Sequence, residues 1–483
     1  MKTYLCVYLG STLLALVVTP AVIWLARRIK AVDAPSVRKV HLNPVPRIGG
    51  VAIFISVICL ILPALFLQNV IGDKFQDIQL KIITLLATAT FVFLVGLVDD
   101  IRGLRARMKL IAELFAATIV CAVGIRIQSV TVADWLTLNF GLFSWPLTLL
   151  WIVGITNAVN LSDGLDGLAA GISAIACGVI AILAIHGGQA VMAVLMLAML
   201  GSLSGFLVFN FSPAKIFMGD CGSLFLGFTI ATASVMCASK SSALVGLVLP
   251  MLALGIPIFD TLFSMLRRFL ERRSVFSADR RHFHHRLLAL GLTQRHVVLV
   301  IYALTALAAG LGMFMMLTRN VQSLVVLFCV LILLLLVFRV VGSVRLRETV
   351  AGLQKKYALS QHRREERIGF EDAQLHFRDA RTFDQWWQAV CEAAQQMDLA
   401  WVSLKTKDKD GTVRTEVWRL ADAPPDMSDL VIMNIPVRDH PTAGPMEFEI
   451  AVLVNGSLES ASHRATLFSR LLDEHGAMVG GQV

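Results

Sequence analysis

The chain contains little charge and no paired cysteine motif. Of its 483 residues, only 16% are Asp, Glu, Lys or Arg, whereas ordinary soluble domains contain about 25%. Because 56% of the residues are hydrophobic, a plain soluble enzyme is excluded. The cysteines form no CxxC pair, so neither a zinc knuckle nor a disulfide framework is indicated. The scattered charge and the 8% of aromatic residues exclude a disordered or fibrous chain.

Long apolar runs dominate the first part of the sequence. A helix needs about 20 apolar residues to cross a bilayer, and the runs predict an all-α polytopic membrane domain of about eleven transmembrane helices. The first run ends in Leu25-Ala26-Arg27-Arg28 and is too long for a cleaved signal peptide. The predicted spans lie near residues 4–25, 49–68, 80–98, 109–125, 145–161, 167–185, 190–209, 222–239, 242–262, 296–317 and 321–341.

The distribution of Lys and Arg predicts the orientation of these spans. Basic residues mark the short loops on the cytoplasmic side of a membrane. With the N-terminus outside, the alternating loops that face inward hold most of the Lys and Arg, and the longest of them is the basic stretch 267–295. The same alternation places the C-terminus in the cytoplasm.

The composition becomes that of a soluble protein near Arg345. We therefore divide the chain into a membrane domain (1–344), a cytoplasmic helical linker (345–395) and a small cytoplasmic α+β domain (396–483). The last unit resembles a small sensor domain of the GAF type but has no ligand or catalytic motif, so we expect it to regulate the protein or to dock a regulator. Its predicted strands are 399–406, 412–420, 430–437 and 446–454, followed by a helix at 463–475.

Acidic residues at membrane depth are costly, which makes them candidates for function. The pair Asp99-Asp100 directly follows an apolar run. Adjacent carboxylates repel each other, and a divalent cation such as Mg²⁺, which prefers oxygen ligands and substrate phosphates, relieves the repulsion. A helix end with two solvated acids is the alternative interpretation.

Two further clusters combine acids with glycine. In the segment 157–167 (NAVNLSDGLDG), polar side chains recur every third residue, which places them on one side of a helix. The glycines allow close approach to a ligand, and the next helix offers N–H groups to phosphate. In the segment 217–223 (FMGDCGS), the acid between glycines indicates a metal ligand near a nucleotide. Helix capping is the alternative for both clusters.

Two basic segments complete the set. The stretch 279–286 (DRRHFHHR) favours an anion site over zinc, because clustered Arg opposes a cation whereas Arg holds phosphate and His donates to it or shuttles a proton. The loop 33–50 is basic and shaped by proline and glycine, which suits an anionic lipid head or a nucleotide. Plain basic loops are the alternative. Together the five clusters predict phosphoryl transfer from a nucleotide-linked donor to a lipid acceptor at a membrane surface.

The ordered motifs resemble those of the polyprenyl-phosphate N-acetylhexosamine-1-phosphate transferases, a part of glycosyltransferase family 4. The similarity runs from about Asp33 to His296 and includes RKxHxxPxPxxGG, DD, NxxNxxDGxDG, FMGDxGS and HxHH. The HxHH form is more similar to the GlcNAc-1-phosphate branch than to the phospho-MurNAc-pentapeptide translocases, which have consecutive histidines there. The C-terminal unit lies outside the resemblance.

The resemblance implies roles for individual residues. Mg²⁺, with Mn²⁺ as a substitute, is expected on Asp220, with Asp99 and Asp100 close to the metal and to the lipid phosphate. The expected catalytic residues are Asp99, Asp100, Asp163, Asp166, His284 and His285. The expected substrate-binding residues are Arg38, Lys39, His41, Lys109, Asn157, Asn160, Phe217, His282 and Arg286.

The implied reaction joins a UDP-N-acetylhexosamine to undecaprenyl phosphate and releases UMP, in the bacterial inner membrane with the active site in the cytoplasm. GlcNAc is the expected sugar, and GalNAc or a deoxy-N-acetylhexosamine is the alternative. An oxygen of the lipid phosphate attacks the β-phosphorus directly, or Asp99 acts first as base or nucleophile. We favour direct attack because such phosphate esters, with a second pKa of about 6, are mostly ionised near neutrality. No nucleic acid partner is expected, and homodimerisation stays open.

Two other classes of function compete with this interpretation. A transporter or flippase needs polar residues at the midplane of several spans, and here Glu113 is the main charged residue within a predicted span. A membrane-tethered sensor would have its active part in residues 346–483. Release of UMP distinguishes the transferase from both.

Overall fold

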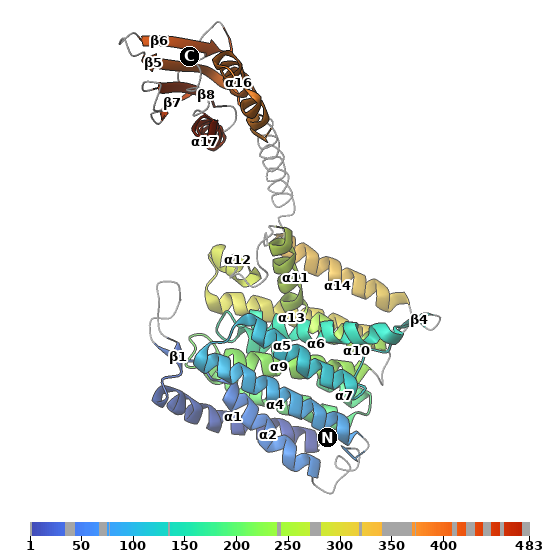
Figure 1. Ribbon diagram of the computed structural model, residues 1–483. Coiled ribbons are helices and arrows are strands. Elements are labelled where there is room, and N and C mark those ends of the chain that lie inside the picture. The colour runs from blue at the N-terminus through green and yellow to red at the C-terminus, as the bar shows by residue number, and fades with distance from the viewer. Residues whose placement is uncertain are drawn as a thin grey trace. The chain divides into compact units, whose positions relative to one another are not determined.

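The chain folds into two compact units, Met1–Thr349 and Val350–Val483. A computed structural model describes residues 2–33, 44–66, 75–76, 78–133, 136–238, 243–270, 282–317, 321–340, 370–371, 373–407, 413–421, 430–437, 446–454 and 458–475. The first unit is helical and the second combines helices with a sheet (Figure 1).

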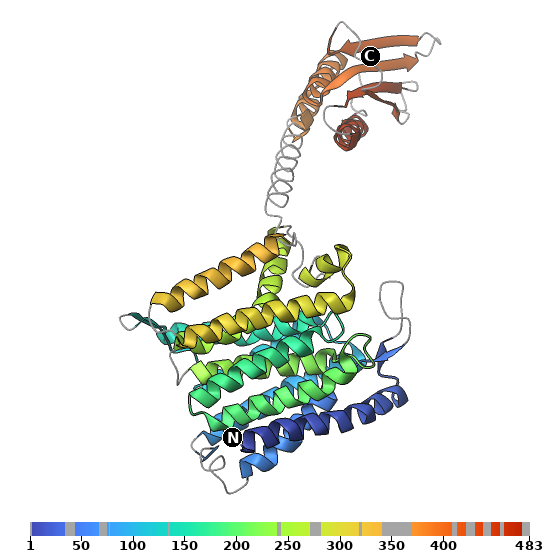
Figure 2. The same cartoon turned by 180° about the vertical axis from the view of Figure 1, so that it is seen from behind.

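The first unit is a bundle whose long helices run side by side (Figures 1 and 2). Two small hairpins accompany it, β1–β2 (Val32–Asp33 with Val45–Pro46) and β3–β4 (Ser129–Ala133 with Leu136–Asn139). The helices are α1 (Lys2–Arg28), α2 (Gly50–Phe66), α4 (Gln79–Arg102), α5 (Ala106–Ala122), α6 (Ser144–Ser162), α7 (Leu168–His186), α8 (Ala190–Asn210), α9 (Gly219–Ala238), α10 (Ala243–Ala253), α11 (Gly255–Leu270), α12 (Phe283–Ala289), α13 (Gln294–Leu317) and α14 (Val321–Val340).

The helices confirm a polytopic membrane protein. Within the described residues, seven helices are long and apolar enough to cross a membrane, or eight if α10 and α11 together make one span. Two more apolar helices, Gly50–Pro63 and Phe328–Arg339, are shorter. The predicted number of eleven spans is therefore not confirmed by length and hydropathy.

The predicted span 242–262 is bent, because the helix breaks inside it. The axes of α10 and α11 differ by 78°. The break coincides with Gly255-Ile256-Pro257. Proline has no N–H to donate to the carbonyl of the preceding turn, and glycine adds conformational freedom, so the sequence favours a bend here.

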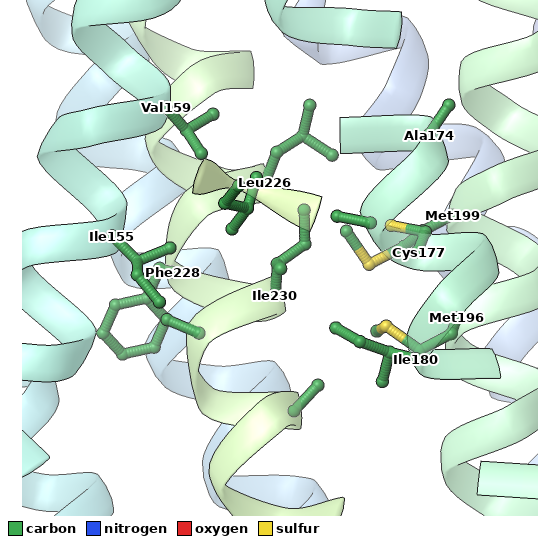
Figure 3. Close-up of a cluster of buried hydrophobic side chains, with 14 of the residues drawn as sticks. Ile155, Val159, Ala174, Cys177, Ile180, Met196, Met199, Leu226, Phe228 and Ile230 are labelled. Carbon is green, nitrogen blue, oxygen red and sulfur yellow. The ribbon is translucent and has the colours of Figure 1, made fainter. Parts of the chain in front are cut away.

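Helix α9 lies at the centre of the bundle. Its apolar stretch is completely buried inside the bundle, and the helix contacts α2, α4, α6, α7 and α10. A helix that is apolar on all sides is buried in a protein core or in a membrane, and α9 is enclosed by its neighbouring helices. The position of α9 therefore places its first residues at the middle of one end of the bundle. Figure 3 shows Leu226 and Ile230 of α9 between Ile155 and Val159 of α6 on one side and Cys177, Ile180, Met196 and Met199 of α7 and α8 on the other, with Phe228 of α9 beside Ile155.

The second unit is an antiparallel four-stranded sheet of order β6-β5-β8-β7. The predicted strands are confirmed, and the closing helix begins at Leu458, earlier than expected. Residues 383–396, which we expected in the linker, form a helix that packs into the same core. The GAF-type assignment stays a prediction. The elements are α16 (Phe383–Gln396), β5 (Leu399–Lys407), β6 (Val413–Arg419), β7 (Leu430–Val437), β8 (Met446–Leu453) and α17 (Leu458–His475).

Candidate active site

The site is built around Lys109, which lies between two acidic side chains. Its Nζ donates to Asp99 Oδ2 at 2.8 Å and to Asp220 Oδ2 at 2.5 Å. Asp99 is in the last turn of α4, and the turn at Gly103 (φ 71°) reverses the chain so that α5 carries Lys109 back beside it. The N–H of Leu104 donates to the other oxygen of Asp99. One ammonium group thus links α4, α5 and α9.

Asn160 holds the second oxygen of Asp220. Its Nδ2 donates to Asp220 Oδ1 at 3.0 Å and to Ser223 Oγ at 2.9 Å. Asn157, one turn earlier on α6, donates to the buried carboxylate of Glu113 and to the carbonyl of Val153. The predicted polar face of the segment 157–167 therefore points at α5 and α9.

Asp100 fixes the start of α9. Its carboxylate accepts the N–H groups of Asp220 (3.0 Å) and Cys221 (2.9 Å), and Arg47 Nη2 lies 3.4 Å from Oδ1. The first N–H groups of a helix have no partner within the helix, and a negative charge there is favourable. A Cβ on Gly219 (φ 76°) would lie 2.6 Å from Asp100 Oδ2, so glycine is required for this contact.

Asp163 follows the last turn of α6 and lies beside the same helix start. The N–H of Gly219 donates to its carboxylate, and the negative charges of Asp220 and Asp100 are close to it. Burial, reinforced by these charges, raises the pKa of Asp163 to about 8. Asp166 has a different contact: its Oδ2 accepts a hydrogen bond from the N–H of Ala214 at 3.0 Å. This bond ties the loop 163–167, called the donor-site loop after its expected role, to the segment before α9.

The histidine segment, residues 282–286, packs against the donor-site loop. A Cβ on Gly164 would lie 2.8 Å from His284 Nε2, so the ring packs directly against that glycine. His284 is buried among His282 (ring centroids 5.7 Å apart) and His285 (4.4 Å). Burial, with a smaller contribution from His285, lowers the pKa of His284 to about 3. A neutral His284 offers a hydrogen bond to a substrate but no positive charge. Arg286 lies on the same short helix.

The basic loop 33–50 contacts the site through its last residues. The N–H of Phe217 donates to the carbonyl of Pro46 at 2.8 Å, and the carbonyl of Phe217 accepts a hydrogen bond from the N–H of Gly49 at 2.9 Å. The loop 44–50 therefore lies against the start of α9. The predicted substrate-binding residues Arg38, Lys39 and His41 lie outside the described residues.

Some residues of the site had no predicted role. Asp260 accepts a hydrogen bond from the histidine segment, and Arg47, Glu113 and Ser223 contact Asp100, Asn157 and Asn160. Glu113 and Asp260 were recognisable as acids inside predicted spans. Arg47 and Ser223 lie within the motifs, but nothing in their spacing indicates a partner.

Among the residues that the structure describes, the acidic groups of the site outnumber the cations that contact them. This excess and the supply of carboxylate oxygens fit Mg²⁺, which prefers such ligands. No group of three or more His, Cys, Asp and Glu side chains in the described part of the chain is arranged as metal ligands, and the ammonium of Lys109 lies between two of the acids. The acids are Asp99, Asp100, Asp163 and Asp220, and the cations are Lys109 and Arg47.

Comparison with known proteins gives the same assignment. Residues 82–238 match the family model described as glycosyl transferase family 4. The chain is 40% identical over 339 residues to a probable undecaprenyl-phosphate N-acetylglucosaminyl 1-phosphate transferase of Bacillus subtilis, which covers 70% of this chain and 92% of the relative. It is 34% identical over 320 residues to the decaprenyl-phosphate N-acetylglucosaminephosphotransferase of Mycobacterium leprae, and the match covers 59% of this chain and 77% of the relative.

A second Bacillus subtilis protein separates two branches of these enzymes. Its phospho-N-acetylmuramoyl-pentapeptide-transferase is 32% identical over 288 residues (56% of this chain and 83% of the relative), less than the 40% of the N-acetylglucosaminyl enzyme. This order agrees with the HxHH form of the histidine motif. With its membrane bundle, its converging motifs and this level of identity, the chain belongs to the polyprenyl-phosphate N-acetylhexosamine-1-phosphate transferase family.

Proposed function

We propose that the protein transfers GlcNAc-1-phosphate from UDP-GlcNAc to undecaprenyl phosphate and releases UMP. The observation that carries the proposal is the contact of Lys109 with both Asp99 and Asp220, with Asp163 beside Asp220, at one end of an apolar bundle. The printed names of the relatives support the choice of GlcNAc, and UDP-GalNAc or a UDP-deoxy-N-acetylhexosamine is the alternative donor. The reaction would be the first membrane step of a cell-surface polysaccharide, such as lipopolysaccharide.

The residues present suit a Mg²⁺-dependent transfer. Asp220 and Asp99 would hold the ion, which would neutralise the charge of the donor diphosphate. Lys109 holds the two carboxylates together, and Asn160 orients Asp220 through its second oxygen. Asp100 is one of the acids of the site. Because it also keeps the start of α9 in place, we assign it a second role, which is to position Asp220.

The contacts of Asp99 support direct attack by the lipid phosphate. Leu104 and Lys109 donate to its two oxygens, so attack by either oxygen of Asp99 would weaken a hydrogen bond that this oxygen already accepts. The ionised lipid phosphate needs no such change. We assign Asn157, Asp163 and Asp166 to the donor side, and His282, His284, His285 and Arg286 to the sugar phosphate.

We also propose that this end of the bundle faces the cytoplasm. UDP-sugars are soluble cytoplasmic donors, and the loops at this end contain most of the Lys and Arg. The C-terminal unit would then be cytoplasmic, where a module that regulates the enzyme or docks a regulator has access to it.

Asp99→Asn and Asp100→Asn separate chemistry from positioning. Asp99→Asn and Asp220→Asn should each lower UMP release by at least about 10²-fold with a smaller loss of stability than Asp100→Asn, because each also removes a repelling charge. Asp100→Asn should also destabilise the protein by about 1–3 kcal/mol, since an amide accepts at only one atom and leaves a buried N–H unpaired. UMP release with purified protein and thermal unfolding in detergent measure both quantities. Equal stability losses in all three variants would contradict the separate roles.

Mg²⁺ binding has a readout that needs no turnover. Mg²⁺ should raise the thermal midpoint of the wild-type protein relative to EDTA, because a ligand that binds only the folded state stabilises it. Asp220→Asn should abolish the shift. Asp398→Asn, in the C-terminal unit, is the matched control and should keep it. An unchanged midpoint in wild-type protein at millimolar Mg²⁺ would argue against a magnesium site.

The orientation is tested by single cysteines in a background without the native ones. Leu290→Cys, in the exposed turn after α12, should react with a membrane-impermeant maleimide only when the cytoplasmic side is accessible. Leu142→Cys, in the exposed 3₁₀ turn Gly141–Phe143 before α6, should react from the periplasmic side. The opposite pattern would reverse the assigned topology.

A further inference from the structure

An acidic residue in the broken span has no role in the function proposed above. Asp260 lies on α11 and is only 8% exposed. Burying a carboxylate in an apolar segment is expensive unless it is fully hydrogen-bonded. Its partners therefore indicate why an acid occupies this position.

Both oxygens of Asp260 contact the histidine segment. Oδ1 accepts the N–H of Phe283 at 2.9 Å, and Oδ2 lies 3.0 Å from His282 Nδ1. Phe283 is the first residue of α12, whose first N–H groups have no partner within the helix. One carboxylate thus fixes both the start of α12 and the ring that precedes it.

The contact also fixes which nitrogen of His282 carries hydrogen. A carboxylate only accepts hydrogen bonds, so Nδ1 carries the hydrogen of this contact, and in that tautomer Nε2 is the acceptor. The same arrangement of an acid behind a histidine orients the base of serine hydrolases. The ring of His282 is parallel to that of His284, with an interplanar angle of 2°, and His284 packs against Gly164 of the donor-site loop.

The bend between α10 and α11 explains how the acid reaches this position. Helix α11 leaves the direction of α10 by 78° and packs against α6 and α13. Because α6 ends in the donor-site loop, α11 is held by the same helix that positions Asp163. The acid therefore stands on a rigid element rather than on a loop.

We propose that Asp260 is a positioning residue: it sets the tautomer of His282 and anchors α12, so that Nε2 of His282 is presented as an acceptor to a hydroxyl or amide of the donor sugar. The proposal rests on the proposed function, since it names the group that orients the donor-side histidines of that reaction.

Asp260→Asn tests the tautomer directly. The amide oxygen keeps the hydrogen bond from Phe283, whereas the amide N–H₂ faces His282 Nδ1 and favours the opposite tautomer. We expect kcat to fall by about 10–100-fold, with the thermal midpoint close to that of the wild type. Leu262→Ala, an exposed position on the same helix, is the control and should leave kcat unchanged.

A double-mutant cycle distinguishes positioning from a general effect on the fold. If Asp260 acts through His282, Asp260→Asn should cost little further activity in a His282→Ala background, because coupled residues are not additive. Additive losses, or an unchanged kcat in Asp260→Asn, would overturn the proposal. Wild-type protein that releases no UMP from any UDP-sugar would refute the proposed function instead.

A second variant covers the case in which Asp260→Asn does not fold. His282→Asn keeps an N–H near the position of Nδ1, so the anchor to Asp260 persists, but it has no group at the position of Nε2. It should fold with a wild-type thermal midpoint and lose activity to the same extent as His282→Ala. Wild-type activity in His282→Asn would contradict the role of Nε2.

Discussion

The site depends on the mutual repulsion of carboxylates held at the end of an apolar bundle. Asp99 and Asp220 approach each other because the ammonium of Lys109 lies between them. Asp100 is tolerated because its charge meets the N–H groups at the start of α9 and the guanidinium of Arg47. In the described part of the chain these contacts leave the acids in excess, and a divalent cation would balance this excess together with the charge of a diphosphate donor.

The bundle supports this arrangement through the position of α9. A helix buried on every side cannot tilt to expose its first turn, so Asp220 stays at the centre, where the ends of α4 and α6 meet it. The broken span α10–α11 adds a second rigid element on the donor side, and Asp260 uses it to hold the histidine segment. Positioning and chemistry are thus assigned to different acids of the same chain.

Local patterns predicted much of this molecule. Apolar runs located the helices, alternation located the four strands of the second unit, and each polar motif is a short segment whose residues share a helix end. The contact of Lys109 with Asp220 was not predictable, because it joins residues 111 positions apart and depends on how α5 packs. Asp260 was overlooked because it lies in an apolar run whose bend the hydropathy does not reveal. The role of Asp100 in holding the start of α9 was also not predictable, because its partners are backbone N–H groups of a helix far away in the sequence.

The most direct test of the central claim is the coupling between Lys109 and Asp220, measured by thermal and denaturant unfolding. Lys109→Met should destabilise the protein by about 3–5 kcal/mol, because it leaves buried carboxylates without their cation. Adding Asp220→Asn should recover a large part of that loss, since it removes one of the unpaired charges. If the two losses simply add, Lys109 does not hold the acids together and the account of the site is wrong.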